Sequence, residues 1–99
     1  MLEITKKENG SETELFLSGR LDTLTAPQLD AAVKEISPDA KSLVMDLTDL
    51  EYVSSAGLRV IIMAQRMMSK QGKLILRGCR EEIMEIFRMT GFAQILNFA

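Results

Sequence analysis

Two stretches near the start of the chain, Leu2 to Glu8 and Glu12 to Gly19, alternate loosely between apolar and polar residues. Alternation with a period of two is typical of β-strands that bury one face. The two stretches are joined through Asn9-Gly10, a strong hairpin signal because both residues tolerate positive φ angles. We therefore predict a β-hairpin at the N-terminus.

A helical pattern follows the loop Gly19-Arg20-Leu21-Asp22. Thr25 and Gln28 have the spacing of a capping box, and Pro27 lies in the first turn, where its missing N–H is harmless. Apolar residues then recur at i, i+3, i+4 and i+7, as in an amphipathic helix: Leu29, Ala32, Val33 and Ile36. Ser37-Pro38-Asp39 ends the predicted helix.

The middle of the chain predicts a strand, a helix and a second strand. Residues 41–47 contain the continuously apolar run Leu43-Val44-Met45, which favours a buried strand. A helix is predicted from Ser55 to Gln71, stopped by Gly72, and a strand over residues 73–77. Such a βαβ unit has parallel strands and a right-handed crossover.

The last helix is predicted from about Arg80 to Thr90, ending at Gly91. Gln94 to Phe98 forms either a short strand or a docked tail. The order is therefore ββαβαβα(β). We predict one α/β domain over residues 1–99, with a mixed sheet of four or five strands and three or four helices.

Charge and composition narrow the class of protein. The net charge is −2, from 12 basic and 14 acidic residues, and neither sign forms a block longer than two. This pattern argues against nucleic-acid binding and against a polybasic membrane patch. No signal-peptide core and no apolar run of about 18 residues is found. We expect a soluble cytoplasmic protein without membrane insertion, and a monomer.

Few residues could carry out catalysis. The chain has no histidine and a single cysteine, Cys79, which excludes Ser–His and Cys–His triads and internal disulfides. Asp46 and Asp49 lack further ligands nearby, so they are weak evidence for a metal site. Asp46 instead fits a loop-structuring role, in which it accepts backbone N–H bonds and fixes the loop that presents Ser55. We expect no enzyme activity, no cofactor and no metal.

Two adjacent serines, Ser54 and Ser55, stand where the central helix opens. On spacing alone, one of them is the N-cap and the other is incidental. Three segments, however, are similar to motifs of one known family: Gly19-Arg20-Leu21-Asp22, Asp46-Leu47-Thr48 and Ser54-Ser55-Ala56-Gly57-Leu58. With the element order, they make the chain resemble the STAS domain family, most closely the free-standing bacterial anti-sigma factor antagonists.

The resemblance implies partner switching controlled by phosphorylation. It implies that the unmodified protein binds an anti-sigma factor, which is also a serine kinase, and frees its sigma factor. Phosphorylation by that kinase falls by position on Ser55 and abolishes binding, and a PP2C-type phosphatase restores it. Many members carry aspartate where this chain has Ser54, so Ser54 is the alternative acceptor. A second reading within the family is a non-catalytic subunit of a lipid-transport or signalling-scaffold complex.

The same motifs imply the residues that contact the partner: Asp22, Ser54, Ser55, Gly57, Leu58 and Arg59. Asp22 fits both a capping role in its loop and a contact to the kinase. Arg59 could partly neutralise a phosphate on Ser55, although a solvated helix residue is its simpler role. The central helix is apolar on more than one side, which indicates either deep burial or an apolar patch for a partner.

Overall fold

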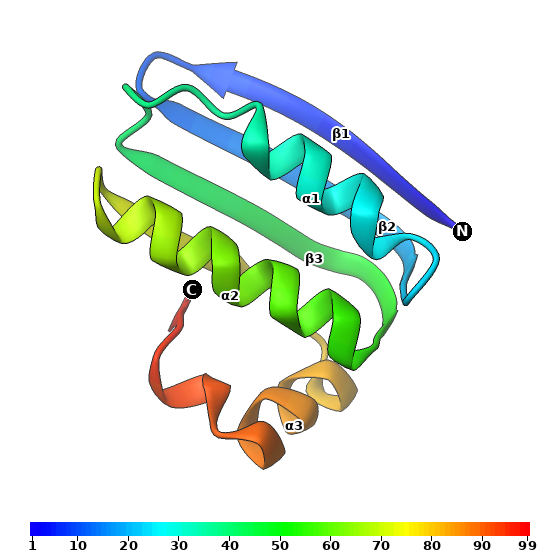
Figure 1. Ribbon diagram of the computed structural model, residues 1–99. Helices are drawn as coiled ribbons and strands as arrows, with labels where there is room; N and C mark the ends of the chain where they lie inside the picture. Colours follow the sequence, from blue (N-terminus) through cyan, green and yellow to red (C-terminus); the bar gives the residue numbers. More distant parts are fainter.

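The computed structural model describes all 99 residues. The elements follow in the order β1 (Leu2–Asn9), β2 (Glu12–Leu21), α1 (Ala26–Lys34), β3 (Ser42–Val53), α2 (Ser55–Ser69), β4 (Lys73–Arg77), α3 (Glu81–Thr90), a 3₁₀ turn (Phe92–Gln94) and β5 (Asn97–Phe98). The predicted fold class is confirmed: the structure has a mixed five-stranded sheet and three α-helices (Figure 1).

The sheet has its strands in the order β1-β2-β3-β4-β5. β1 and β2 form the predicted antiparallel hairpin, and all other neighbours are parallel. In the predicted βαβ unit, Leu43 of β3 pairs with Leu74 of β4. The hairpin loop is Gly10-Ser11, because Asn9 still pairs with Glu12. Only Gly10, at φ +60°, has a positive φ there, so the loop lies one residue later than predicted.

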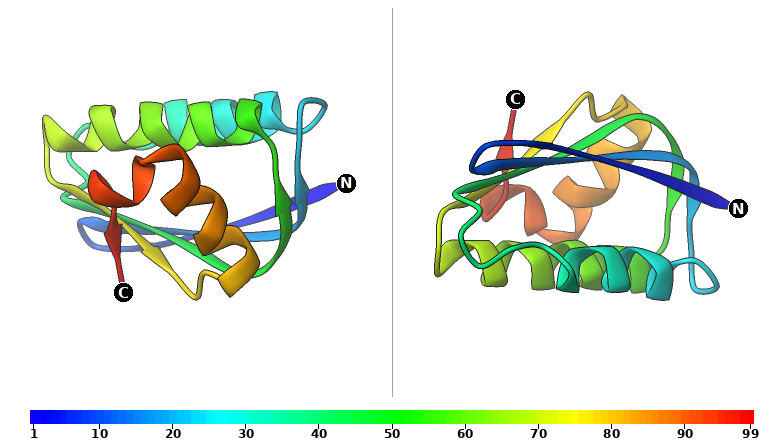
Figure 2. Two further views of the ribbon diagram at one scale, coloured as in Figure 1. Left: turned by 90° about the horizontal axis from the view of Figure 1, so that it is seen from below. Right: turned by 90° about the horizontal axis from the view of Figure 1, so that it is seen from above.

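The helices cover one face of the sheet (Figure 2), and the core lies between the two layers. α1 and α2 lie side by side on this face, and α3 packs beside them toward β4 and β5. The sheet contributes fully buried side chains at alternate positions, Leu15, Leu17, Leu43, Met45, Leu74 and Leu76. The helices contribute Leu29 and Val33, Ile61 and Met68, and Ile83 and Phe87. Each such side chain contributes roughly 1.5–3 kcal/mol of burial free energy.

The capping box predicted for α1 is absent. Thr25 is the N-cap residue, but its side chain makes no capping bond. Its hydroxyl instead donates to the carbonyl of Arg20 at 2.8 Å, and Gln28 donates to the carbonyl of Leu2 at 3.0 Å. Both side chains therefore tie the helix to the preceding chain, Thr25 within its own loop and Gln28 through a long-range bond that the local spacing could not show.

β3 is longer than predicted: it continues past Leu47 to Val53, so the residues that follow Asp46 lie in a strand rather than in a loop. Phe16 pairs with Asp46 and Ser18 with Asp49, so β3 carries an extra residue there, as in a β-bulge. The Asp46 carboxylate accepts the backbone N–H of Thr48 at 2.9 Å. Asp46 thus accepts a backbone N–H as expected, but it stabilises a bulge instead of the loop before Ser55.

On the face of the sheet that carries no helix, Arg77 links three strands. Its guanidinium donates to Glu14 at 2.8 Å and to Asp46 at 3.0 Å, and lies over the ring of Phe16. Burial raises the pKa of the Asp46 carboxyl, but hydrogen bonds from Thr48 and Arg77 outweigh this, so the pKa is lower than its ordinary value. The hydrogen bonds of Arg77 to Glu14 and, second, to Asp46 raise the pKa of the arginine.

Replacing Arg77 with methionine should destabilise the domain, since it leaves two largely covered carboxylates side by side without a cation. We expect a loss of about 1–2 kcal/mol, below the value for a fully buried pair because the arginine is 40% exposed. The melting temperature should fall by about 5–15 °C. Arg88→Met is the matched control: Arg88 pairs with exposed Glu81 and Glu85, so its loss should lower the melting temperature far less. Equal losses in the two variants would contradict the role given to Arg77.

The lowered pKa of Asp46 predicts a pH dependence. A carboxyl with a lowered pKa stabilises the fold above its unfolded pKa, and that contribution is lost as the pH falls through the folded value. The difference in melting temperature between wild type and Asp46→Asn should therefore be largest near pH 6 and shrink below about pH 4. Calorimetry at pH 6, 4.5 and 3 measures it. Asp39→Asn, at an exposed loop position, is the matched control and should change the melting temperature little at pH 6.

Candidate functional site

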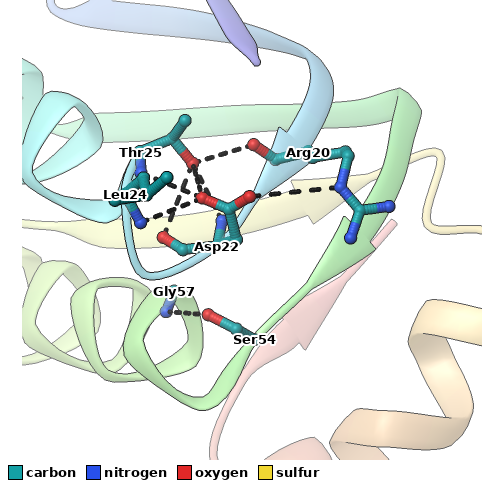
Figure 3. Close-up of polar contacts among 6 residues, drawn as sticks. All are labelled: Arg20, Asp22, Leu24, Thr25, Ser54 and Gly57. Atoms are coloured by element: carbon teal, nitrogen blue, oxygen red, sulfur yellow. Dashed lines mark hydrogen bonds and ion pairs between the residues drawn. The ribbon is translucent and has the colours of Figure 1, made fainter.

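Ser54 caps helix α2. Its backbone is extended, and its side-chain oxygen accepts the N–H of Gly57 at 3.4 Å (Figure 3). Its own backbone N–H donates to the carbonyl of Leu21 at 2.8 Å. Ser54 is half-buried. Its hydroxyl is thus occupied in holding the start of the helix, as expected for one of the two serines.

Ser55 is the first residue of α2 and is exposed. Its hydroxyl makes no hydrogen bond to the rest of the chain, in contrast to that of Ser54. The first N–H groups of a helix lack partners within the helix, and the helix dipole adds positive potential there. A negatively charged group on Ser55 would therefore lie in a favourable field.

Gly57 and Leu58, both predicted to contact a partner, are buried. A Cβ atom on Gly57 would lie 2.6 Å from Cγ of Leu21 and 3.1 Å from its carbonyl oxygen. The missing side chain thus allows α2 to approach the end of β2 closely. Leu58 is 4% exposed and belongs to the core. The structure gives both residues a packing role, and Leu58 also lines a groove described below.

Asp22 organises the loop between β2 and α1. One carboxylate oxygen accepts the N–H groups of Leu24 and Thr25, both at 3.0 Å, and the hydroxyl of Thr25 at 3.1 Å (Figure 3). These bonds, that from the backbone of Thr25 first, lower the pKa of the Asp22 carboxyl. The predicted capping role is thus present. The second carboxylate oxygen lies 4.0 Å from Nε of Arg20.

Arg20 and Tyr52 form a contact that sequence reasoning missed. The guanidinium of Arg20 lies 4.3 Å from the centroid of the Tyr52 ring, a cation–π arrangement. The two residues are paired between β2 and β3. That register follows two irregularities in the pairing of these strands, and no local pattern in the sequence reports it. Arg20 lies two residues before Asp22, and Tyr52 two residues before Ser54.

Arg59 is exposed and makes no ion pair, as expected for a solvated helix residue. It lines two grooves that run along α2. The first, of about 410 Å³, we call the α2–α3 groove; its lining is Ser55, Leu58, Arg59, Ile62, Met63, Arg66, Thr90 and Phe92. The second, of about 340 Å³, lies between α1 and α2. Met63 lines both grooves and is 40% exposed. The other apolar side chains of α2 are mostly buried, so Met63 is the apolar side chain that the helix exposes most.

Cys79 and the acidic residues show no arrangement typical of a catalytic centre. Burial, followed by the charge of Glu81, raises the pKa of the Cys79 thiol to about 11, so at neutral pH it is protonated and a weak nucleophile. No three Cys, Asp or Glu side chains lie close enough together to hold a metal ion. None of the three helices has the length and hydrophobicity needed to cross a membrane.

Two relatives found by sequence comparison are named as anti-sigma factor antagonists. BtrV of Bordetella bronchiseptica, whose name describes an anti-sigma factor antagonist, is 34% identical over 85 residues, which cover 84% of this chain and 73% of BtrV. The anti-sigma-B factor antagonist of Listeria monocytogenes is 29% identical over 95 residues, covering 93% and 82% of the two chains.

Solved structures share the fold. An anti-sigma factor antagonist from Mycobacterium paratuberculosis matches with a TM-score of 0.89 at 20% identity, over 99% of this chain and 85% of that one. The phosphorylated form of SpoIIAA from Bacillus matches with a TM-score of 0.76 at 16% identity, over 98% and 91%. Residues 4–97 match the family described as "Mlab, STAS domain". The chain therefore belongs to the STAS domain family, as its motifs indicated.

Proposed function

We propose that this chain is an anti-sigma factor antagonist controlled by phosphorylation of Ser55. The unmodified protein binds an anti-sigma factor that is also a serine kinase, and the sigma factor held by that partner is released. Phosphorylation by the kinase ends the binding, and a PP2C-type phosphatase restores it. In this cycle the chain is a ligand and a substrate, not an enzyme. The names of the relatives support the general role.

The observation that carries the proposal is the contrast between the two serines. Ser54 is half-buried and its oxygen caps α2, whereas Ser55 is exposed with a free hydroxyl. A kinase needs an accessible hydroxyl on a fixed backbone, and the first turn of α2 holds Ser55 beside the Asp22 loop. This contrast favours Ser55 over Ser54 as the acceptor.

A phosphate on Ser55 is expected to act at the interface and not on the fold. The start of a helix favours negative charge, so the added group should not unfold the domain. It would, however, add up to two negative charges and their hydration to a surface that must be desolvated against the partner. SpoIIAA, which has this fold, has been solved both with and without its phosphate.

Variants of Ser55 test the switch. Ser55→Ala should retain the anti-sigma factor from host lysate and Ser55→Asp should lose it, because the carboxylate places charge at the interface. The captured protein is identified by mass spectrometry, purified and titrated against both baits. We expect at least a tenfold difference in Kd, which corresponds to about 1.4 kcal/mol.

Ser37→Asp is the matched control for charge. Ser37 is exposed, accepts the N–H of Asp39 at 3.1 Å and lies near the C-terminal end of α2, where Gln71 bonds its carbonyl. Its aspartate variant should bind as wild type does. The same partners on the alanine and aspartate baits of Ser55 would contradict the proposal. Transporter or scaffold subunits among them would favour the second reading within the family.

Melting temperatures separate the two serines. Ser55→Asp should melt within a few degrees of wild type, since an acidic residue suits the first turn of a helix. Ser54→Ala removes the capping bond, which is long at 3.4 Å. The free energy of unfolding should fall by about 0.5–1 kcal/mol and the melting temperature by roughly 3–8 °C. A fall of more than about 8 °C in Ser55→Asp would show that charge there acts on the fold. No fall in Ser54→Ala would contradict the capping role.

A further inference from the structure

The α2–α3 groove is long and follows one face of a helix. Its lining residues on α2 recur at intervals of three and four, from Ser55 to Arg66, so they form a stripe about 16 Å long. Thr90, at the end of α3, and Phe92, in the following turn, form the opposite bank. A groove of this length fits a segment of polypeptide rather than one small group.

The charge of this groove is opposite to that of the whole chain. The chain has a net charge of −2, but the groove is lined by two arginines and no acidic residue. Both Arg59 and Arg66 are exposed, and neither guanidinium takes part in a hydrogen bond or an ion pair. Of the other four arginines, Arg20, Arg77 and Arg88 each face at least one carboxylate, and Arg80 donates to the carbonyl of Thr48. The cations of the groove are therefore free for an external acid.

Besides the two arginines, the groove is lined mainly by apolar side chains. Leu58, Ile62, Met63 and Phe92 lie in its wall. Of these, Met63 is the most accessible, at 40% exposure. Methionine adapts its shape to a partner more readily than branched side chains do. The site thus combines apolar contacts with a positive charge toward each end.

We propose that the α2–α3 groove binds an acidic amphipathic segment of the anti-sigma factor. This inference rests on the function proposed above and extends the binding surface three helical turns beyond Ser55. Arg59 and Arg66 are seven residues apart, or about 10 Å along α2. The segment carries two carboxylates at a matching separation, as at positions i and i+7 of a helix, with apolar residues between them.

The location of Ser55 at one end of this groove links the groove to the switch. A phosphate there carries about −1.5 to −2 charges at neutral pH, which offsets the two positive charges of Arg59 and Arg66. Phosphorylation thus weakens the attraction for an acidic segment at the end of the groove nearest Ser55, and repels the carboxylate placed there.

Charge reversal at Arg66 tests the groove separately from Ser55. Arg66→Glu is titrated against the purified anti-sigma factor by calorimetry, with Arg66→Gln as the neutral variant. We expect Kd to rise about tenfold or more for glutamate, and less for glutamine. Unchanged melting temperatures should accompany both, since Arg66 has no partner in the fold. A lysine in place of one partner carboxylate should restore binding to Arg66→Glu and weaken binding to wild type.

Lys73→Glu is the matched control. Lys73 is exposed and pairs with Ser42 on the helix-free side of the sheet, so its reversal should change Kd less than twofold. If Arg66→Glu binds as well as wild type while Ser55→Asp does not bind, the groove lies outside the interface and the proposed function stands. If wild type binds no anti-sigma factor at all, the proposed function fails and this inference fails with it.

Discussion

The contact between Leu21 and Gly57 holds the whole site together. The fully buried Leu21 ends β2, and the absence of a side chain on Gly57 lets the first turn of α2 lie against it. The bond from the N–H of Ser54 to the carbonyl of Leu21 fixes the same approach. Because Asp22 follows Leu21 directly, the carboxylate that organises its loop is kept beside the two serines. Any side chain at position 57 would separate these segments.

The arginines divide the molecule into two functional surfaces. On the helix-free face of the sheet, Arg77 is bonded to Glu14 and Asp46 and joins three strands. On the helical side, Arg59 and Arg66 are left without partners beside apolar side chains. The same residue type thus stabilises the fold on one side, and on the other side remains free for the partner segment proposed above.

Periodicity was enough to predict the elements but not their long-range contacts. The spacing of Leu29 and Val33, and the apolar run Leu43-Val44-Met45, placed a helix and a strand correctly because burial of one face dominates both. The predicted end of β3 was wrong because the polar residues after Leu47 still pair with β2, through bulges in the register. Thr25 and Gln28 have the spacing of a capping box, but Thr25 bonds the carbonyl of Arg20 in its own loop and Gln28 the distant carbonyl of Leu2. At the site, the position of Ser54 before the helical pattern was enough to predict it as a possible N-cap. The Arg20–Tyr52 contact depends on the register of β2 and β3, which no local pattern in the sequence reports.

The ends of the sheet have a consequence for solubility. β5 has only two residues, and β1, the other border, carries Glu3, Lys6, Lys7 and Glu8 among its eight. Short or charged border strands resist pairing with another copy through the backbone. A neighbouring molecule that approaches the sheet therefore meets charged side chains along β1 and only two residues at β5. Extension of the sheet by a second copy is disfavoured at both borders.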